Sequence, residues 1–162
     1  MNPATAQQLI DLNRRFYQAF GGAFAATRRR LQPGAARAIA CRPNCGNWLD
    51  LGCGSGEVAR HLAKLGFSGS YTGLDFSPTL LEEARQGWPS PSGAFSPNFR
   101  LADLTAPGWA ERLPPAGFDV ILCLAALHHL PGRELRLALL RGARALLKTG
   151  GVFIHSEWQF QH

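Results

Sequence analysis

The sequence predicts an α/β fold, with a doubly wound parallel sheet between two layers of helices. Three observations lead to this prediction. Short, nearly continuous apolar segments recur along the chain, which is the pattern of parallel strands covered on both faces. Turn residues and amphipathic helical patterns alternate with these segments, which indicates strand–helix units in the strand order 3-2-1-4-5. The 162 residues suffice for one domain with a single core.

Glycines at alternate positions follow the first predicted strand, residues 48–51. Gly52 permits a tight turn, and Gly54 leaves room for a ligand to approach the backbone. Gly56 allows the next helix, which is expected to begin near Glu57, to pack closely against the strand. The sequence therefore predicts a nucleotide-like ligand at the amino end of this helix.

Glu57 distinguishes this turn from the dinucleotide fingerprint G-x-G-x-x-G, which has its third glycine at that position. A carboxylate is a poor neighbour for a pyrophosphate bound at a helix N-terminus. A ligand that combines adenosine, an amino acid and a positive sulfonium tolerates it well. A dehydrogenase is therefore a distant alternative.

The second predicted strand, residues 71–75, ends on the carboxylate of Asp75. An acidic residue about 20 positions beyond the glycine turn is where a ribose diol is held, and each charge-assisted hydrogen bond is worth roughly 1.5 to 3 kcal/mol. Phe76 could lie against an adenine face. Ser77 is the expected N-cap of a helix over residues 79–86. Asp75 could instead merely cap the strand end.

Two further strands are expected, one over residues 99–103 that ends on Asp103 and one that begins at Phe118. The second opens into a loop that carries His128 and His129.

The final elements are an amphipathic helix over residues 134–147 and a fifth strand over residues 152–155. Folds of this kind bind ligands at the carboxyl ends of their strands, beside the switch between the first and fourth strands.

Taken in order, these landmarks resemble the class I S-adenosylmethionine-dependent methyltransferases, over about residues 48–158. The resemblance implies a Rossmann-like sheet, S-adenosylmethionine as cofactor, and Asp103 as partner of the adenine amino group. The candidate cofactor-binding residues are Asp50, Gly52, Cys53, Gly54, Gly56, Asp75, Phe76, Asp103, Leu104 and Cys123.

Members of this superfamily usually continue beyond the fifth strand with a helix and an antiparallel pair of strands. The chain ends at His162, so we expect a shortened sheet that lacks these strands. Its fifth strand would then present Phe153, Trp158 and Phe160 at an open edge. A partner chain or a second copy could cover this edge, and the chain could be a cofactor-binding module without its own turnover.

Methyl transfer from a sulfonium mainly requires that the two reactants be oriented, which supplies roughly 7 to 11 kcal/mol. His128 and His129 are the candidate catalytic residues, for acceptor positioning or general-base work. Either could instead be part of the loop structure. No metal is expected, because two histidines without a nearby carboxylate make a poor site. The cysteines at positions 41, 45, 53 and 123 are expected to be free thiols.

Positive charge is concentrated at the start of the chain. Residues 1–45 carry seven arginines and one acid, so the whole net charge of +6 belongs to this segment, and residues 46–162 are neutral overall. We expect 1–45 to be a basic helical segment ahead of the cofactor domain, 46–162. Its predicted helices, over 5–20 and from Ala23 or Gly34 to about Ala40, are separated by Gly21-Gly22.

The triple arginine in this segment is the candidate acceptor-binding patch, because guanidinium groups bind phosphates in a bidentate manner. It could also be a solvated face. It consists of Arg28, Arg29 and Arg30.

A looser resemblance links the chain to bacterial relatives of the tRNA wobble-uridine carboxymethyl methyltransferases. It rests on Phe16-Tyr17, Phe24, Ala26-Thr27-Arg28, His128-His129 and Trp158. It implies a carboxylate acceptor on tRNA, although an anionic small molecule would fit nearly as well. No apolar run is long enough to span a bilayer, and the N-terminus lacks a signal peptide, so a cytoplasmic protein is expected.

Overall fold

A parallel sheet in the order β3-β2-β1-β4-β5 forms the centre of the protein, as the sequence predicts. The computed structural model describes residues 1–162 except 28–29, 87, 89–94 and 158–162. Its strands are β1 Asn47–Leu51, β2 Ser70–Asp75, β3 Asn98–Leu101, β4 Phe118–Leu124 and β5 Leu147–Ser156.

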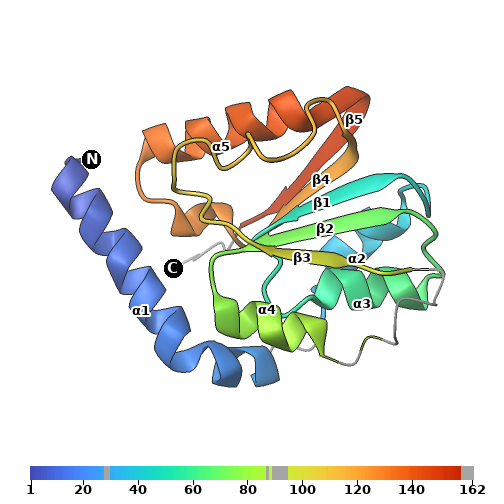
Figure 1. Cartoon of the computed structure of the whole chain (residues 1–162), viewed down its shortest axis with the longest axis horizontal. Helices are drawn as coiled ribbons and strands as arrows, with labels where there is room; N and C mark the ends of the chain where they lie inside the picture. Colours follow the sequence, from blue (N-terminus) through green and yellow to red (C-terminus); the bar gives the residue numbers. More distant parts are fainter. Residues whose placement is uncertain (28–29, 87, 89–94, 158–162) are drawn as a thin grey trace.

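Helices cover both faces of this sheet, which gives the expected three layers (Figure 1). On one face, Leu139 and Ala143 of α5 pack against Leu49 of β1 and Ile121 of β4. On the other face, helix residues that include Leu62 of α3 pack against the same strands. The helices are α1 Pro3–Thr27, α2 Pro33–Ala40, α3 Glu57–Lys64, α4 Pro78–Arg85 and α5 Arg133–Leu146, with the 3-10 turn η1 Leu127–His129.

The strand register brings three loops together at one edge of the sheet. Leu51 at the end of β1 is paired with Leu74 of β2, and Asp50 is paired with Leu122 of β4. Because parallel strands all end on the same side, the loops that follow β1, β2 and β4 converge there.

The helix α1 is continuous through Gly21-Gly22, so the prediction of two helices separated at this pair is wrong. A glycine pair weakens a helix only modestly, and tertiary packing can override that preference. An added Cβ at Gly21 would lie 3.8 Å from both Leu80 and Ser77, so α1 passes close to α4 at this position. The next helix is α2, which begins at Pro33.

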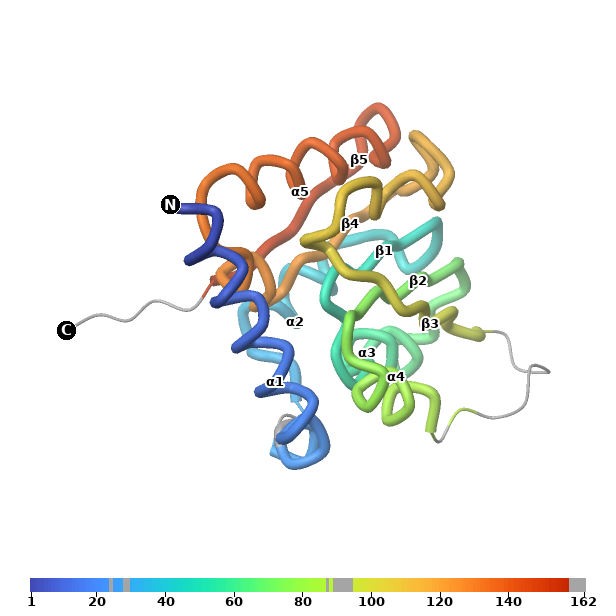
Figure 2. Tube along the Cα trace, turned by 60° about the vertical axis from the view of Figure 1, so that its left-hand side comes forward, coloured from blue at the N-terminus to red at the C-terminus, as the bar shows by residue number. Residues whose placement is uncertain are grey.

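The two sides of α1 have different environments. Ile10, Tyr17 and Ala25 are buried, and Tyr17 and Ala25 pack with Leu80 of α4. The apolar residues whose spacing predicts the helix are instead among its exposed positions, and they are Leu9, Leu12, Phe16 and Phe20. Figure 2 shows α1 beside the carboxyl ends of the strands.

Two strand boundaries differ from the predictions. The strand β3 ends at Leu101, so Asp103 lies in the following loop and not at the strand end. The strand β5 begins at Leu147, directly after α5, and its register with β4 shifts between Phe118 and Val120. The predicted fifth strand, residues 152–155, is the regular part of β5 beyond this irregularity.

Among the described strands, β5 pairs only with β4 and therefore forms an edge of the sheet. Phe153 is partly buried against the core, while the predicted edge residues Trp158 and Phe160 lie outside the described residues. That a partner chain or a second copy covers this edge stays a prediction. Within the described part of the chain, no helix is both long enough and apolar enough to cross a membrane.

Candidate cofactor and acceptor site

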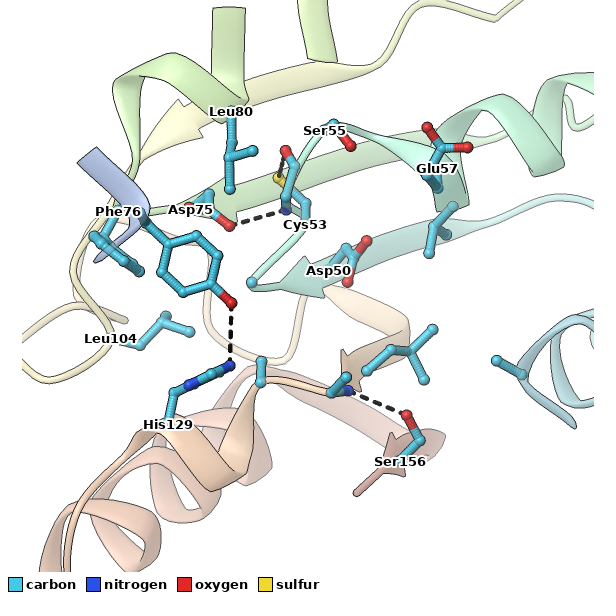
Figure 3. Close-up of a pocket in the computed structure, with 18 of the residues that line it drawn as sticks. Asp50, Cys53, Ser55, Glu57, Asp75, Phe76, Leu80, Leu104, His129 and Ser156 are labelled. Carbon is cyan, nitrogen blue, oxygen red and sulfur yellow. Dashed lines mark hydrogen bonds between the residues drawn. The ribbon is translucent and has the colours of Figure 1, made fainter. Parts of the chain in front are cut away.

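A cavity of about 220 Å³ opens where the loops after β1, β2 and β4 converge. The glycine turn after β1 and Asp75 at the end of β2 form one side of it, and His129 of η1 lies on the other side (Figure 3). The helix α1 contributes Asn13 and Tyr17. The fold therefore brings the beginning of the chain to the same cavity as the predicted cofactor residues.

The three glycines of the turn have different surroundings. Gly52 has φ +78°, and an added Cβ would lie only 2.7 Å from the Cβ of Ala126. Gly54 has φ +53° with nothing within 4 Å of an added Cβ, so its outer side is open toward the cavity. Gly56 does not line the cavity: an added Cβ would meet Ala84 and Phe99 at 3.1 Å. Its small size thus serves the packing of the turn against the neighbouring elements.

The N–H groups of this turn are bonded within the protein. Gly52 and Cys53 donate to the same carbonyl oxygen of β2 at 2.8 and 2.9 Å. Gly54 donates to Asp75 Oδ2 at 2.9 Å, and Gly56 donates to the carbonyl oxygen of Cys53 at 3.0 Å. These four groups are therefore not available as a phosphate cradle. The geometry agrees with the argument from Glu57 against a pyrophosphate.

Asp75 connects the two turns that form this side of the cavity. Besides the bond from Gly54, its Oδ1 accepts the N–H of Ser77 at 2.9 Å, and Ser77 caps α4 as predicted. Burial raises the pKa of Asp75, and the backbone N–H bonds counteract this. Each carboxylate oxygen can accept a second bond, so Asp75 can still receive ribose hydroxyls. The structure shows that Asp75 connects the two turns. Its binding of ribose hydroxyls stays a prediction.

Asp50 is buried and lines the cavity from β1. The hydroxyl of Tyr71 donates to its Oδ2 at 2.6 Å. Burial raises the pKa of Asp50 to about 7, and the nearby Asp75 adds to this increase, while the bond from Tyr71 opposes it. In its ionised form the group would attract a positive charge, such as an ammonium, that enters the cavity.

Asp103 lines the cavity and is bonded to α1. It accepts bonds from the N–H and hydroxyl of Thr105 at 2.9 and 2.6 Å, and it forms an ion pair with Arg14. Burial alone would raise the pKa of Asp103, but the bonds from Thr105 and Arg14 lower it overall. An adenine amino group would therefore share this carboxylate with Arg14.

His129 and Tyr17 both line the cavity, with 3.2 Å between the imidazole Nε2 and the phenol oxygen. Burial and the neighbouring His128 lower the pKa of His129 to about 4, so its imidazole is neutral at pH 7. His128 does not line the cavity, and its Nδ1 lies 3.3 Å from Glu157 Oε2. The structure thus gives the two predicted histidines different surroundings.

The remaining predicted site residues also fall into two groups, those that line the cavity and those that do not. Cys53, Phe76 and Leu104 line the cavity, whereas Cys123 lies in the buried core beneath it. Arg30 lines the cavity together with the predicted cofactor residues, and its role in acceptor binding stays a prediction. The predictions for Arg28 and Arg29 fall outside the described residues. The four cysteines are free thiols, and the described residues contain no cluster of ligands suited to a metal ion.

Several lining residues were not predicted, above all Tyr17, Asn13 and Ser156. Tyr17 lies three and seven positions after Arg14 and Ile10, so the three share one side of α1. That spacing indicates the side of α1 that faces the protein. The apolar pattern on the other side of the helix is stronger, so the sequence alone favours the wrong side. Ser156 accepts the N–H of Ala125, which has an unusual positive φ of 51°, and fixes the start of the histidine loop.

The parallel sheet, the glycine turn and the carboxylates at adjacent strand ends define a Rossmann-like protein that binds an adenosyl ligand without a pyrophosphate. Residues 49–153 match the family model of the methyltransferase domain. The chain belongs to this methyltransferase family.

Similar proteins agree with this assignment. The chain is 32% identical over 108 residues to the ubiquinone biosynthesis O-methyltransferase of Xanthomonas campestris, an alignment that covers 67% of this chain and 41% of that protein. An S-adenosylmethionine-dependent methyltransferase from Mesorhizobium loti shares 31% identity with a TM-score of 0.60, over 76% of this chain and 52% of that one. The amino pentose methyltransferase CalS10 from Micromonospora echinaspora, solved with S-adenosylmethionine bound, shares 27% identity with a TM-score of 0.60, over 78% and 49%.

The chain thus spans about two fifths of the length of the curated relative described above. Family membership and these neighbours support S-adenosylmethionine as the cofactor, as predicted. They do not support the looser resemblance to tRNA wobble-uridine enzymes.

Proposed function

We propose that this chain is the catalytic unit of an S-adenosylmethionine-dependent methyltransferase that acts on a small molecule. The observation that carries the proposal is that one cavity holds the predicted cofactor carboxylates and, opposite them, the Tyr17–His129 pair. The bound cofactor supplies a methyl group that is already electrophilic. The protein has to hold that methyl group against the acceptor atom, and positioning of this kind can supply roughly 7 to 11 kcal/mol.

The cavity's charges fit the proposed cofactor. Asp75 would accept the ribose hydroxyls, and Asp103 would face the adenine amino group. Glu57 and the ionised form of Asp50 would offer negative charge to the amino acid ammonium and the sulfonium. Arg30 is the cavity side chain best suited to the cofactor carboxylate. Gly54 leaves the backbone open for close approach.

A small-molecule acceptor is favoured because the relatives with similar sequences include an O-methyltransferase of ubiquinone biosynthesis and a sugar methyltransferase. A polyanionic acceptor such as tRNA is the second candidate, favoured by the net charge of +6 in residues 1–45. We place the protein in the cytoplasm, where its free cysteines would stay reduced. A partner that covers the β5 edge would complete the sheet.

The test is a calorimetric titration of S-adenosylmethionine into the purified chain, with NAD as the comparison ligand. We expect micromolar binding of S-adenosylmethionine and none of NAD. A Gly54→Val variant, which fills the open side of the turn, should lose this binding and keep its circular dichroism spectrum. Equal binding of both ligands, or no binding by a folded chain, would contradict the proposal.

Turnover is tested separately with a radiolabelled methyl group. Transfer to a small acceptor in the presence of the chain supports the enzyme, and transfer to tRNA alone supports the second candidate. Cofactor binding without transfer to any acceptor would support a binding module without its own turnover.

A further inference from the structure

Arg14 of α1 reaches a carboxylate that the proposed function assigns to the cofactor. Its Nη2 forms an ion pair with Asp103 Oδ2, although the two residues are 89 positions apart in the chain. Asp11, one turn earlier on α1, places its Oδ1 3.5 Å from Nη1 of the same guanidinium. The ion pair therefore joins α1 to the loop that follows β3.

Arg14 approaches Asp103 from outside the cofactor cavity. Asp103 lines that cavity, whereas Arg14 is not among its described lining residues. Both residues line a second cavity of about 530 Å³, whose wall is formed by α1, the start of α4 and the loop after β3. The guanidinium thus holds the carboxylate without occupying the space in which the cofactor would lie.

The bonds of Asp103 determine which of its oxygens can take a further donor. Each carboxylate oxygen can accept about two hydrogen bonds. The N–H and the hydroxyl of Thr105 both donate to Oδ1, at 2.9 and 2.6 Å. Among the described residues, Arg14 is the one donor to Oδ2. A ligand N–H is therefore expected at Oδ2, the oxygen that Arg14 holds.

The same bonds favour the charged form of Asp103. Burial raises the pKa of Asp103, but the bonds from Thr105 and Arg14 outweigh burial and lower the pKa overall. An ionised carboxylate can only accept hydrogen bonds. It matches the amino group of adenine, and it opposes the carbonyl oxygen that hypoxanthine carries at the same place. Because Thr105 and Arg14 each hold one oxygen, the carboxylate cannot easily turn to another edge of the base.

We propose that Arg14 is a positioning residue for the cofactor: it holds the Asp103 carboxylate in place to accept the adenine amino group, so that recognition of the base depends on the docking of α1. The inference rests on the proposed function, in which Asp103 faces the adenine. It adds a residue that lies outside the cofactor cavity and acts through Asp103.

Calorimetry with S-adenosylhomocysteine and with S-inosylhomocysteine tests the inference without turnover. The second ligand differs only in its base, where a carbonyl oxygen replaces the amino group. The wild type should bind S-adenosylhomocysteine roughly tenfold more tightly, or better. Arg14→Gln should weaken S-adenosylhomocysteine binding about three- to tenfold and change S-inosylhomocysteine binding less than about twofold. Arg14→Lys keeps the charge and should show an intermediate preference for adenine.

Arg15→Gln is the matched control, because it removes the same charge from the neighbouring position of α1. Arg15 is exposed and donates to the carbonyl oxygen of Asp11 in its own helix at 3.4 Å. This variant should leave both affinities within about twofold of the wild type.

Asp103→Asn tests whether Arg14 acts through the carboxylate. The single variant should lose most of the preference for adenine, since its side chain can turn an N–H toward the base. When Asp103→Asn is already present, Arg14→Gln should cause less than about a twofold further loss of S-adenosylhomocysteine affinity. Circular dichroism of each variant checks that the chain is folded.

The outcomes separate this inference from the proposed function. If S-adenosylhomocysteine does not bind to the folded wild type, the proposed function fails. If it binds but the wild type does not distinguish the two bases, only the role of the Arg14–Asp103 pair is overturned. The same holds if Arg14→Gln weakens both ligands equally or neither, or if its full effect persists when Asp103→Asn is present.

Discussion

Asp50 should reduce the stability of the folded protein at neutral pH, and replacing it with asparagine should reveal how much. Its side chain is fully buried on β1, and the Tyr71 hydroxyl donates to it at 2.6 Å. Asparagine has almost the same shape and keeps an oxygen that can accept this bond. The variant Asp50→Asn therefore removes the ionisable group with little change in packing.

The magnitude follows from the pKa of Asp50, which burial raises from 3.8 to about 7. Between these values the unfolded chain releases the proton and the folded chain retains it. Stability contributed by the protonated form is complete below about pH 4 and is lost as pH rises through about 7. Each tenfold difference in proton affinity between the folded and unfolded chains corresponds to about 1.4 kcal/mol, so the loss reaches at most about 4 kcal/mol.

The assay is urea unfolding of wild type and Asp50→Asn at several pH values between 4 and 8, followed by circular dichroism. The difference in unfolding free energy should be near zero at pH 4 and should reach about 2 to 4 kcal/mol in favour of the variant at pH 8. The variant should also bind S-adenosylmethionine more weakly, because it lacks the carboxylate that faces the cavity. A stability difference that stays constant from pH 4 to pH 8 would refute this reasoning.

Asp119→Asn is a control of opposite sign. The backbone N–H of Asn47 donates to Asp119 at 2.7 Å, and Lys148 contacts both its oxygens at 2.9 and 2.8 Å. The N–H bond, followed by the bonds from Lys148, lowers the pKa of Asp119. Its stabilising effect is present above the ordinary aspartate pKa and is lost as pH falls through the lowered value. This variant should therefore be less stable than wild type at pH 7, with a difference that disappears in acid.

Four further predictions concern the cofactor side. Gly54→Ala should bind S-adenosylmethionine at least tenfold more weakly with about 1 kcal/mol loss of stability, because its Cβ occupies open space at a positive φ. Gly52→Ala should unfold more easily, by roughly 2 kcal/mol or more, since its Cβ would lie 2.7 Å from that of Ala126; thermal unfolding compares the two variants. Asp75→Asn should weaken cofactor binding at least tenfold in calorimetry. It should also lower stability by about 1 to 3 kcal/mol, because the N–H groups of Gly54 and Ser77 bond to different oxygens of Asp75 and an amide has only one oxygen. Arg30→Gln should weaken S-adenosylmethionine binding several-fold and leave adenosine binding unchanged, and equal losses for both ligands would contradict the pairing of Arg30 with the cofactor carboxylate.

The strand order and the glycine turn could be predicted because both depend on local patterns. Continuous apolar runs identify buried parallel strands, and the spacing of Gly52, Gly54 and Gly56 identifies the turn. The position of Asp75 follows from the same motif, and the structure places it beside Gly54. Short-range signals of this kind do not require knowledge of distant contacts.

The contribution of α1 could not be predicted from such signals. Its continuity through Gly21 depends on close packing against α4, which outweighs the helix-weakening effect of glycine. The pairs Arg14–Asp103 and Tyr17–His129 join residues 89 and 112 positions apart. Contacts over such distances arise only once the sheet has assembled. The residues predicted to bind the cofactor therefore lie mostly around one cavity together with the predicted His129, but the part of the wall that α1 contributes was not predicted.

The bonded N–H groups of the glycine turn have a consequence for how a ligand enters. Gly52 and Cys53 donate to β2, and Gly54 donates to Asp75, so bonds within the protein hold the turn in its shape without a ligand. Its amides should be protected from hydrogen exchange even in the ligand-free protein. Association then requires little ordering of this loop, and the entropy cost of binding is correspondingly small. Entry would be governed instead by α1, which lies beside the opening and contributes Asn13 and Tyr17 to its wall.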